Sequence, residues 1–245
     1  GEMFEKDQKH EIVKIVNTIN EEIMKYLNPV YNVMRQVPLY GNELRNSTRA
    51  VRESIEGTID VMIEDVNVSE FMAKILEMET KEEAIDQVLT FFLAGYDTSA
   101  STITWALYLL HKKENEKYLE YIREELKYQE ESSMLINVIK ETLRLYPAGG
   151  GGFIRKYNGE TSFPEEWALR SDIIVPVYSM HRHPEYWIHA NEFLPKRWEL
   201  VDEGDMTNIF MPFSQGSRNC IGKHFAMLEI YSVLSMIPKY VHFES

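Results

Sequence analysis

The sequence is poor in cysteine: Cys220 is the only one in 245 residues. A single thiol cannot form an internal disulfide, so the chain is not a disulfide-stabilised secreted domain. With 44% hydrophobic residues, the composition is nevertheless that of a globular protein with a real core. Cys220 is therefore either an inert small side chain or a group with a chemical role.

Positive charge is also scarce. The chain has 26 basic and 39 acidic residues, a net charge of −13, so the phosphate backbone of a nucleic acid would be repelled and general nucleic-acid binding is excluded. Local basic groups close in sequence to Cys220 form either a docking surface for an acidic electron donor or an ordinary solvated surface. They are Lys196, Arg197, Arg218, Lys223 and His224.

Long uncharged stretches are missing apart from one, residues 88–110, which only Asp97 interrupts. The stretch is long enough to span a bilayer. An acid near its centre would be costly in lipid, and the stretch is rich in serine and threonine, which is not a lipid-facing composition. We therefore expect a long helix buried within a protein core.

Helical periodicity dominates up to residue 147, and the remainder is mostly turns and short strands, so the sequence predicts a mainly α fold with small β elements. Thr80 and Glu83 form a capping box that starts the long helix, and Pro147 marks the end of the last helix of this region. The predicted helices are 8–27, 43–64, 68–77, 81–112, 114–128, 132–146 and 221–237. The predicted strands are 153–155 and 173–178, and 184–219 is predicted to be mainly coil.

The segment around the cysteine reads Phe213-Ser-Gln-Gly-Ser-Arg-Asn-Cys-Ile-Gly222. Gly216 and Gly222 permit turns and close approaches that a Cβ would block, and Arg218 supplies a permanent positive charge. A helix is predicted to begin at or beside Cys220, and the positive end of its dipole would stabilise a thiolate. Such a thiolate is a soft metal ligand, whereas a lone cysteine in a glycine-rich turn is more often a buried small hydrophobe.

Ala94-Gly-Tyr-Asp-Thr98 lies in the middle of the predicted long helix. Gly95 costs about 1 kcal/mol relative to alanine there, which a ligand pressed against the backbone would explain. Asp97 and Thr98 point about 100° apart around the helix, so only one of them can face such a ligand squarely. The alternative is a packing glycine beside two polar residues in a crowded core.

Glu141 and Arg144 are three residues apart, close enough to pair on one helix face. Exposed pairs of this kind are common and contribute little, but the strongly apolar flanks predict that this pair is partly buried and needs further partners. His181 and His183 in isolation suggest a metal pair, but beside a proline-rich turn we interpret them as structural.

Four motifs together resemble the C-terminal portion of the cytochrome P450 family. The cysteine segment resembles the haem-binding loop Phe-x-x-Gly-x-Arg-x-Cys-x-Gly, and residues 94–98 resemble the oxygen-binding motif. Glu141-x-x-Arg144 resembles the family's Glu-x-x-Arg pair, and Pro195-Lys-Arg197-Trp resembles the segment that supplies a further arginine.

The resemblance implies the C-terminal portion of the P450 fold, as one incomplete domain. Its helical region is 1–147, its strands and coil are 148–219, and the cysteine loop helix and tail are 220–245. The N-terminal half of the family fold and the strands after the cysteine helix are expected to be missing. Cys220 would be the proximal ligand of the iron of haem b. The other expected haem-binding residues are Phe213, Gly216, Arg218, Gly222, Ala94 and Gly95.

The same resemblance implies roles for five polar residues. Thr98 would hydrogen-bond the dioxygen and Asp97 would help to bring in protons. Glu141, Arg144 and Arg197 would form a structural salt-bridged triad that fixes the coil beneath the haem. Arg155 is a possible partner of a haem propionate. The four glycines 149–152 indicate either a wide substrate pocket or a flexible linker.

The implied function is a haem-thiolate monooxygenase that inserts one atom of O2 into an apolar substrate, with electrons from NADPH delivered by a flavoprotein reductase. The motifs resemble those of microsomal members, which implies attachment to the cytosolic face of the endoplasmic reticulum through an absent N-terminal anchor, or otherwise a cytoplasmic protein. The alternative is a truncated, non-catalytic fragment with weak or no haem binding.

Overall fold

A computed structural model describes the chain from Thr80 onward with few gaps, and single residues or short pieces before it. The chain divides into two compact units, residues 1–94 and 95–245, which are described separately. The described residues are Arg49, Glu53, Glu56, 73–75, Glu77, 80–157, 172–201, Met206 and 208–240, with only the backbone of 238–240. The predicted helix 8–27 therefore lies outside the described residues, as do most of 43–64 and 68–77.

Helix α5 (Lys81–Leu110) starts in the first unit and ends in the second. The N–H of Glu83 donates a hydrogen bond to Thr80 Oγ1 at 3.2 Å, which satisfies one of the unpaired donors of the first turn, as the predicted cap requires. Within the first unit, Lys81 also pairs with Glu56 at 3.2 Å. The prediction of a helix over 81–112 is confirmed to within two residues at its end.

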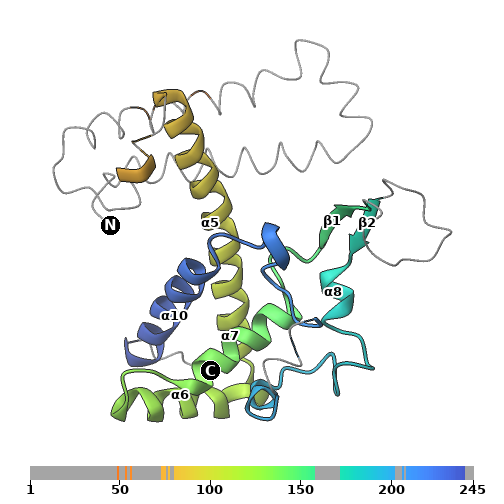
Figure 1. Ribbon diagram of the computed structural model, residues 1–245. Coiled ribbons are helices and arrows are strands. Elements are labelled where there is room, and N and C mark those ends of the chain that lie inside the picture. The colour runs from red at the N-terminus through yellow and green to blue at the C-terminus, as the bar shows by residue number, and fades with distance from the viewer. Residues whose placement is uncertain are drawn as a thin grey trace, which may run out of the picture. The chain divides into compact units, whose positions relative to one another are not determined.

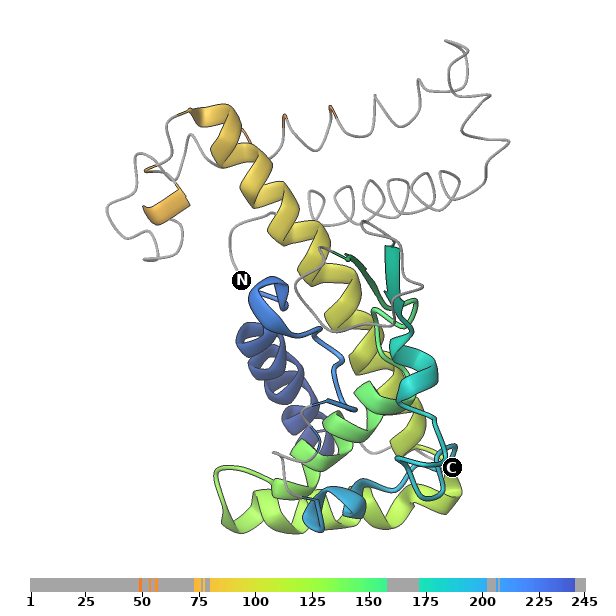
Figure 2. The ribbon, with the colours of Figure 1, turned by 45° about the vertical axis from the view of Figure 1, so that its right-hand side comes forward.

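The second unit is mainly α-helical, with one small sheet (Figures 1 and 2). After α5 come the 3₁₀ turn η1 (Lys113–Asn115), α6 (Glu116–Tyr128) and α7 (Ser133–Leu145), close to the predicted 114–128 and 132–146. Helix α10 (Lys223–Tyr240) follows the cysteine loop and begins three residues after Cys220. Between α7 and α10, the described residues form two short strands and short helical turns.

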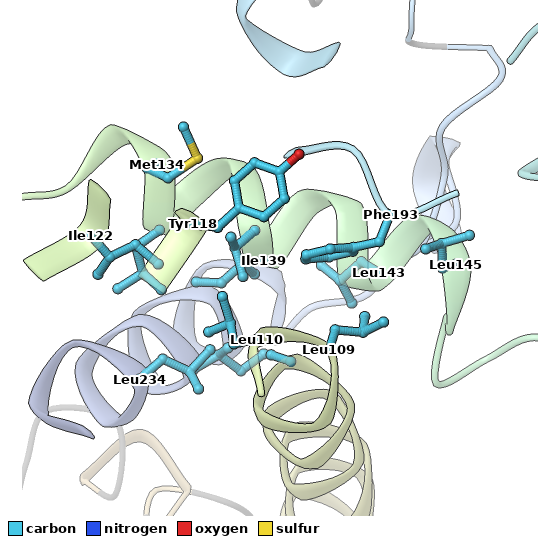
Figure 3. Close-up of a cluster of buried hydrophobic side chains, with 14 of the residues drawn as sticks. Leu109, Leu110, Tyr118, Ile122, Met134, Ile139, Leu143, Leu145, Phe193 and Leu234 are labelled. Atoms are coloured by element: carbon cyan, nitrogen blue, oxygen red, sulfur yellow. The ribbon is translucent and has the colours of Figure 1, made fainter. Parts of the chain in front are cut away.

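One hydrophobic cluster holds these helices together (Figure 3). Ile139 of α7 is fully buried among Leu110 of α5, Ile122 of α6 and Leu234 of α10, which the 3.6-residue periodicity of each helix places on its inner face. Burial of side chains this large contributes about 1.5–3 kcal/mol each. Helix α7 is thus the central element, in contact with both α6 and α10.

The start of α7 is fixed by hydrogen bonds from its neighbours. Ser132 Oγ accepts from the Leu135 N–H at 3.0 Å, and the Ser132 N–H donates to the hydroxyl of Tyr231 on α10 at 2.7 Å. Burial would raise the pKa of the Glu125 carboxyl, but hydrogen bonds from Ser132, the Met134 N–H and Ser133 outweigh it and lower the pKa below its usual value. These bonds set the register of α7 against α6 and α10.

Strands β1 (Phe153–Lys156) and β2 (Asp172–Val175) form an antiparallel pair with Phe153 opposite Val175. The predicted strand 173–178 is wrong at its end, because residues 177 and 178 begin the short helix α8 (Val177–Met180). Pro176 has no N–H to donate to a ladder, so pairing stops at Val175. One glycine of the run before β1 is required: Gly152 has φ +87°, and a Cβ there would lie 1.9 Å from the Val175 carbonyl oxygen.

A stack of aromatic rings and an arginine ties the start of this coil to the helices. Trp105 of α5 stacks on Tyr146, which ends α7, with ring centroids 3.9 Å apart. The Arg182 guanidinium lies over the rings of Tyr146 and Tyr178 at 5.4 and 4.5 Å and donates to the Leu145 carbonyl at 2.7 Å. The coil that begins at His181, after α8, is therefore held against the end of α7 by Arg182.

Candidate functional site

The carboxylate of Glu141 is the centre of a buried polar network. Oε1 accepts hydrogen bonds from Arg144 Nη2, the Leu194 N–H and Arg197 Nε at 2.8–3.0 Å. Oε2 accepts from Arg144 Nε at 2.9 Å and from the indole N–H of Trp198 at 3.0 Å. Both Glu141 and Arg144 have side chains with no exposure to solvent, so the pair is more deeply buried than the sequence predicts.

Arg144 uses its remaining donors on backbone carbonyls of the coil. Nη1 donates to the carbonyls of His181 and Ala190 at 2.8 and 2.6 Å, and Nη2 donates to that of Glu192 at 3.0 Å. The guanidinium also lies 5.1 Å from the centre of the Trp187 ring. A buried charge is tolerated only when it is paired and hydrogen-bonded, and Arg144 meets that condition with every N–H.

Arg197 completes the network from the 3₁₀ turn η2 (Pro195–Glu199). Its Nε pairs with Glu141 at 3.0 Å, while Nη1 and Nη2 donate to the carbonyls of Ile188 and His189 at 2.6 and 3.1 Å. The structure thus brings together the three residues expected to form a triad. The motif at 195–198 includes Trp198, but sequence reasoning did not foresee its hydrogen bond to Glu141. It also missed the Leu194 N–H, because nothing in a residue's type shows where a backbone donor will lie.

His181 lies beside this network, buried and without exposure to solvent. Its Nε2 accepts a hydrogen bond from the Met211 N–H at 3.0 Å, and its ring contacts those of Trp187 and Phe210. Burial lowers the pKa of the ring to about 4, and the positive charge of Arg144 lowers it further. The backbone carbonyls of Arg144 and Leu143 act in the opposite direction and favour protonation. His183, the other predicted structural histidine, is exposed.

The cysteine loop is closed by its own backbone. The Cys220 N–H donates to the Phe213 carbonyl at 2.8 Å, and the Asn219 N–H to that of Gly216 at 3.1 Å, within the turn η3 (Gly216–Arg218). Ser214 and Gly216 have φ of +59° and +78°, so the chain turns twice through the left-handed region. For Ser214 that conformation costs on the order of 1 kcal/mol and requires support from its surroundings.

The loop presents its thiol outward. Cys220 is exposed, as are Gly216 and Arg218, whereas Phe213 is half-buried and packs against the hydrophobic cluster. Gly222 is half-buried, and a Cβ added to it would lie 3.9 Å from Cys220 Sγ. The loop is thus anchored at Phe213 and presents Cys220 at its surface. It can offer one soft ligand, the thiol, to a metal that other groups outside the loop also hold.

The residues of the motif at 94–98 lie on α5. Asp97, Thr98 and Ala94 are exposed, and Gly95 is half-buried with no atom within 4 Å of the place where a Cβ would lie. Thr98 Oγ1 donates to the Gly95 carbonyl at 3.5 Å. The other threonine hydroxyls of α5 donate to backbone carbonyls at 2.7–2.9 Å, so this bond is the weakest of the set.

Arg155 of β1 is directed to the cysteine loop. Nη2 donates to Ser214 Oγ at 3.2 Å, and the guanidinium lies 4.6 Å from the centre of the Phe153 ring. Among the residues that the structure describes, no three His, Cys, Asp or Glu side chains gather as a metal site.

A cavity of about 520 Å³ lies beside the start of the cysteine loop, with Phe213, Ser214 and Gln215 in its lining. It is lined by Leu143 of α7, Trp198, Phe210 and Lys223, among others, and neither Cys220 nor any residue of α5 lines it.

The comparisons with known proteins agree with the motifs. A family model described as Cytochrome P450 matches residues 1–240. Cytochrome P450 3A31 of Mesocricetus auratus is 35% identical over 167 residues, which cover 63% of this chain and 33% of that protein. The taurochenodeoxycholic 6 alpha-hydroxylase of Sus scrofa is 35% identical over 164 residues, 61% of this chain and 32% of that protein.

The fold has a counterpart among solved structures. The crystal structure of a cytochrome P450 (CYP102L1) matches with a TM-score of 0.71 at 23% identity, covering 91% of this chain and 54% of the other. The chain spans 33% and 32% of the two curated relatives described above. In the described ranges, no helix combines the length and the apolar character needed to cross a membrane.

We predict that Glu141→Gln lowers the free energy of unfolding by about 3–5 kcal/mol, because it leaves Arg144 buried without its counter-charge. Urea-induced unfolding followed by circular dichroism measures this. Asp172→Asn is the matched control, since it removes an ion pair with Lys156 that is exposed on both sides, and it should change the same quantity by less than about 1 kcal/mol. Similar losses in the two variants would contradict the buried network.

We predict a pH dependence of stability from His181. The unfolded ring titrates near 6.5 and the folded ring near 4, so between these values the unfolded state binds the extra proton. The stabilisation of the folded state by the neutral ring is fully present above pH 6.5 and is lost as the pH falls toward 4. At roughly 1.36 kcal/mol per pKa unit, the free energy of unfolding falls by up to about 3 kcal/mol.

The measurement is the free energy of unfolding as a function of pH for the unaltered chain and for His181→Gln. Carboxylates such as Glu125 weaken both proteins in acid and cancel in the difference. The two curves should converge as the pH falls from 6.5 to 4; curves that stay parallel would show that His181 is not held neutral.

Proposed function

Because the chain belongs to the cytochrome P450 family, we propose that it supplies the haem-binding portion of a haem-thiolate monooxygenase. The observation that carries the proposal is the exposed Cys220 at the end of a loop closed by the Cys220 N–H on the Phe213 carbonyl at 2.8 Å. A cysteine thiolate that holds haem iron would supply electron density that favours O–O bond cleavage.

The described residues fit a haem in three respects. The thiol is exposed, so a metal can reach it from outside the loop. Arg218 and Arg155 lie on or against the loop and offer positive charge to carboxylate groups such as propionates. Gly95 leaves the backbone of α5 open to a flat ligand.

Each residue then has a defined task. Cys220 would hold the iron, and Gly216 and Gly222 would shape the turn around it, while Phe213 fixes the loop to the core. When bound, the haem supplies the chemistry by which one atom of O2 enters an apolar substrate and the other leaves as water, with two electrons and two protons. Glu141, Arg144 and Arg197 hold the coil in place without touching the reacting atoms.

Thr98 and Asp97 are proposed to serve proton delivery from the surface of α5. The Thr98 hydroxyl lies at an exposed position of α5, and its hydrogen bond to the Gly95 carbonyl is long, at 3.5 Å. The adjacent carboxylate of Asp97 is exposed and can exchange protons with water. A positioned hydroxyl and an exposed acid together make a short path from solvent.

We also propose the cellular setting that the motifs suggest. The chain would belong to a protein at the cytosolic face of the endoplasmic reticulum membrane, and electrons would come from NADPH through a flavoprotein reductase. The support is the likeness of its motifs to those of microsomal members of the family.

The second candidate function is a non-catalytic fragment that binds haem weakly or not at all. One observation favours it: the match covers about a third of each of the two curated relatives described above. The described residues around Cys220 therefore correspond to only part of the fold that surrounds a haem in such proteins.

We predict that the unaltered chain, mixed with haem, reduced and exposed to carbon monoxide, shows the red-shifted Soret band of thiolate-ligated haem. Cys220→Ala should abolish that band, because Cys220 is the only thiol in the chain. Ser217→Ala, a change at an exposed position of the same loop, should preserve it. Absence of haem uptake by the unaltered chain would reject the monooxygenase in favour of the non-catalytic fragment.

We further predict that Thr98→Ala uncouples electron transfer in the haem-loaded protein. With NADPH and a flavoprotein reductase, the hydrogen peroxide released per NADPH oxidised should rise severalfold, because protons no longer arrive where they are needed. Thr104→Ala is the matched control, since Thr104 lies on the same helix and bonds the Ala100 carbonyl at 2.8 Å. Equal peroxide yields in the two variants would remove Thr98 from the proton path.

A further inference from the structure

His181 joins the buried network to the cysteine loop through two hydrogen bonds on opposite ends of the residue. Its backbone carbonyl accepts from Arg144 Nη1 at 2.8 Å. Its ring Nε2 accepts from the N–H of Met211 at 3.0 Å. The residue has no exposure to solvent, so water cannot replace either partner.

Met211 stands at the entrance of the cysteine loop. Its carbonyl accepts from the Ser214 N–H at 3.1 Å, and Ser214 is the first residue of the loop with a positive φ. Two residues after Met211, Phe213 gives its carbonyl to the Cys220 N–H. The Met211 N–H is thus the point where the loop backbone meets the coil that Arg144 holds.

The ring can accept this hydrogen bond only when Nε2 is unprotonated, which in the neutral ring places the proton on Nδ1. Nδ1 is buried and makes no hydrogen bond of full geometry, although the carbonyls of Arg144 and Leu143 favour a proton on the ring. The ring is therefore held mainly by Nε2 and by the aromatic rings of Trp187 and Phe210. Of the charged groups around it, Arg144 is paired with Glu141, and Arg182 follows in sequence with its guanidinium over two tyrosines. A neutral ring is what burial beside a cation favours.

We propose that His181 is a positioning residue for the cysteine loop: by accepting the Met211 N–H, it transmits the fixed geometry of the Glu141–Arg144 pair to the segment that presents Cys220. The role in haem ligation rests on the function proposed above. The hydrogen bond itself and the order of the loop do not depend on haem.

The decisive experiment is hydrogen exchange with mass spectrometry on the unliganded 245-residue chain, in peptides that contain residues 211–220. His181→Phe keeps a ring of similar size but removes the acceptor, so the Met211 amide should exchange about tenfold faster. His181→Gln restores an acceptor at the end of a side chain of suitable length and should recover some of the protection. His183→Phe is the matched control at an exposed histidine and should change nothing in these peptides.

Faster exchange in His181→Phe with recovery in His181→Gln supports the inference. Both variants lose the packing of the histidine ring, but only the glutamine provides a hydrogen-bond acceptor. Equal exchange in His181→Phe and His181→Gln, or in His181→Phe and His183→Phe, overturns it. Should His181→Phe fail to fold, nuclear magnetic resonance on the ¹⁵N-labelled unaltered chain decides. A scalar coupling between the Met211 amide nitrogen and His181 Nε2 supports the bond, and its absence at neutral pH overturns it.

A second readout separates this inference from the proposed function. In the haem-loaded protein, His181→Phe should lower the fraction of the carbon monoxide complex that shows the red-shifted thiolate band, and His183→Phe should not. If the unaltered chain takes up no haem, the proposed function fails, while the exchange experiment still decides whether His181 positions the loop.

Discussion

The structure depends most on one carboxylate that has no contact with water. Glu141 accepts five hydrogen bonds, from two arginines, one tryptophan and one backbone N–H. An ionised carboxylate could not remain in that position without them, because its desolvation would cost several kcal/mol. In its described residues, the coil after α8 has little regular structure of its own. Its path is set by the hydrogen bonds that its backbone makes with Glu141 and Arg144.

A series of direct contacts connects Glu141 to the cysteine loop. Helix α7 is packed at the middle of the hydrophobic cluster, which fixes Glu141 and Arg144. The two arginines hold carbonyls of residues 181–192, and His181 holds the N–H of Met211. Phe213 then anchors the loop in the core. A rigid interior thus supports an exposed thiol. This arrangement is expected of a site that binds a group from outside the protein.

Several features could be predicted from residue types because they depend on short-range physics. The periodic apolar residues gave α5, α6 and α7 nearly to their ends, and the cap at Thr80 has its hydrogen bond. Sequence reasoning failed where backbone geometry decides, since residues 177–178 form a helical turn after Pro176 instead of extending a strand. Nor does residue type show that, of the four glycines, only Gly152 combines a positive φ with a contact that excludes a Cβ. The polar motifs pointed to Glu141, Arg144 and Arg197, but the depth of their burial was underestimated.

The sequence by itself determined which groups are available: one thiol, an acid and a base three residues apart, and a later arginine in a proline-led turn. It also determined the family, since four motifs in a fixed order are recognisable without coordinates. Only the tertiary structure decided that Arg144 would bind three carbonyls and that His181, rather than His183, would be buried beside Met211. The physical reason is that every residue carries the same carbonyl and nearly every one the same N–H, so the partners of a buried charge are chosen by the path of the chain and not by the identity of its side chains.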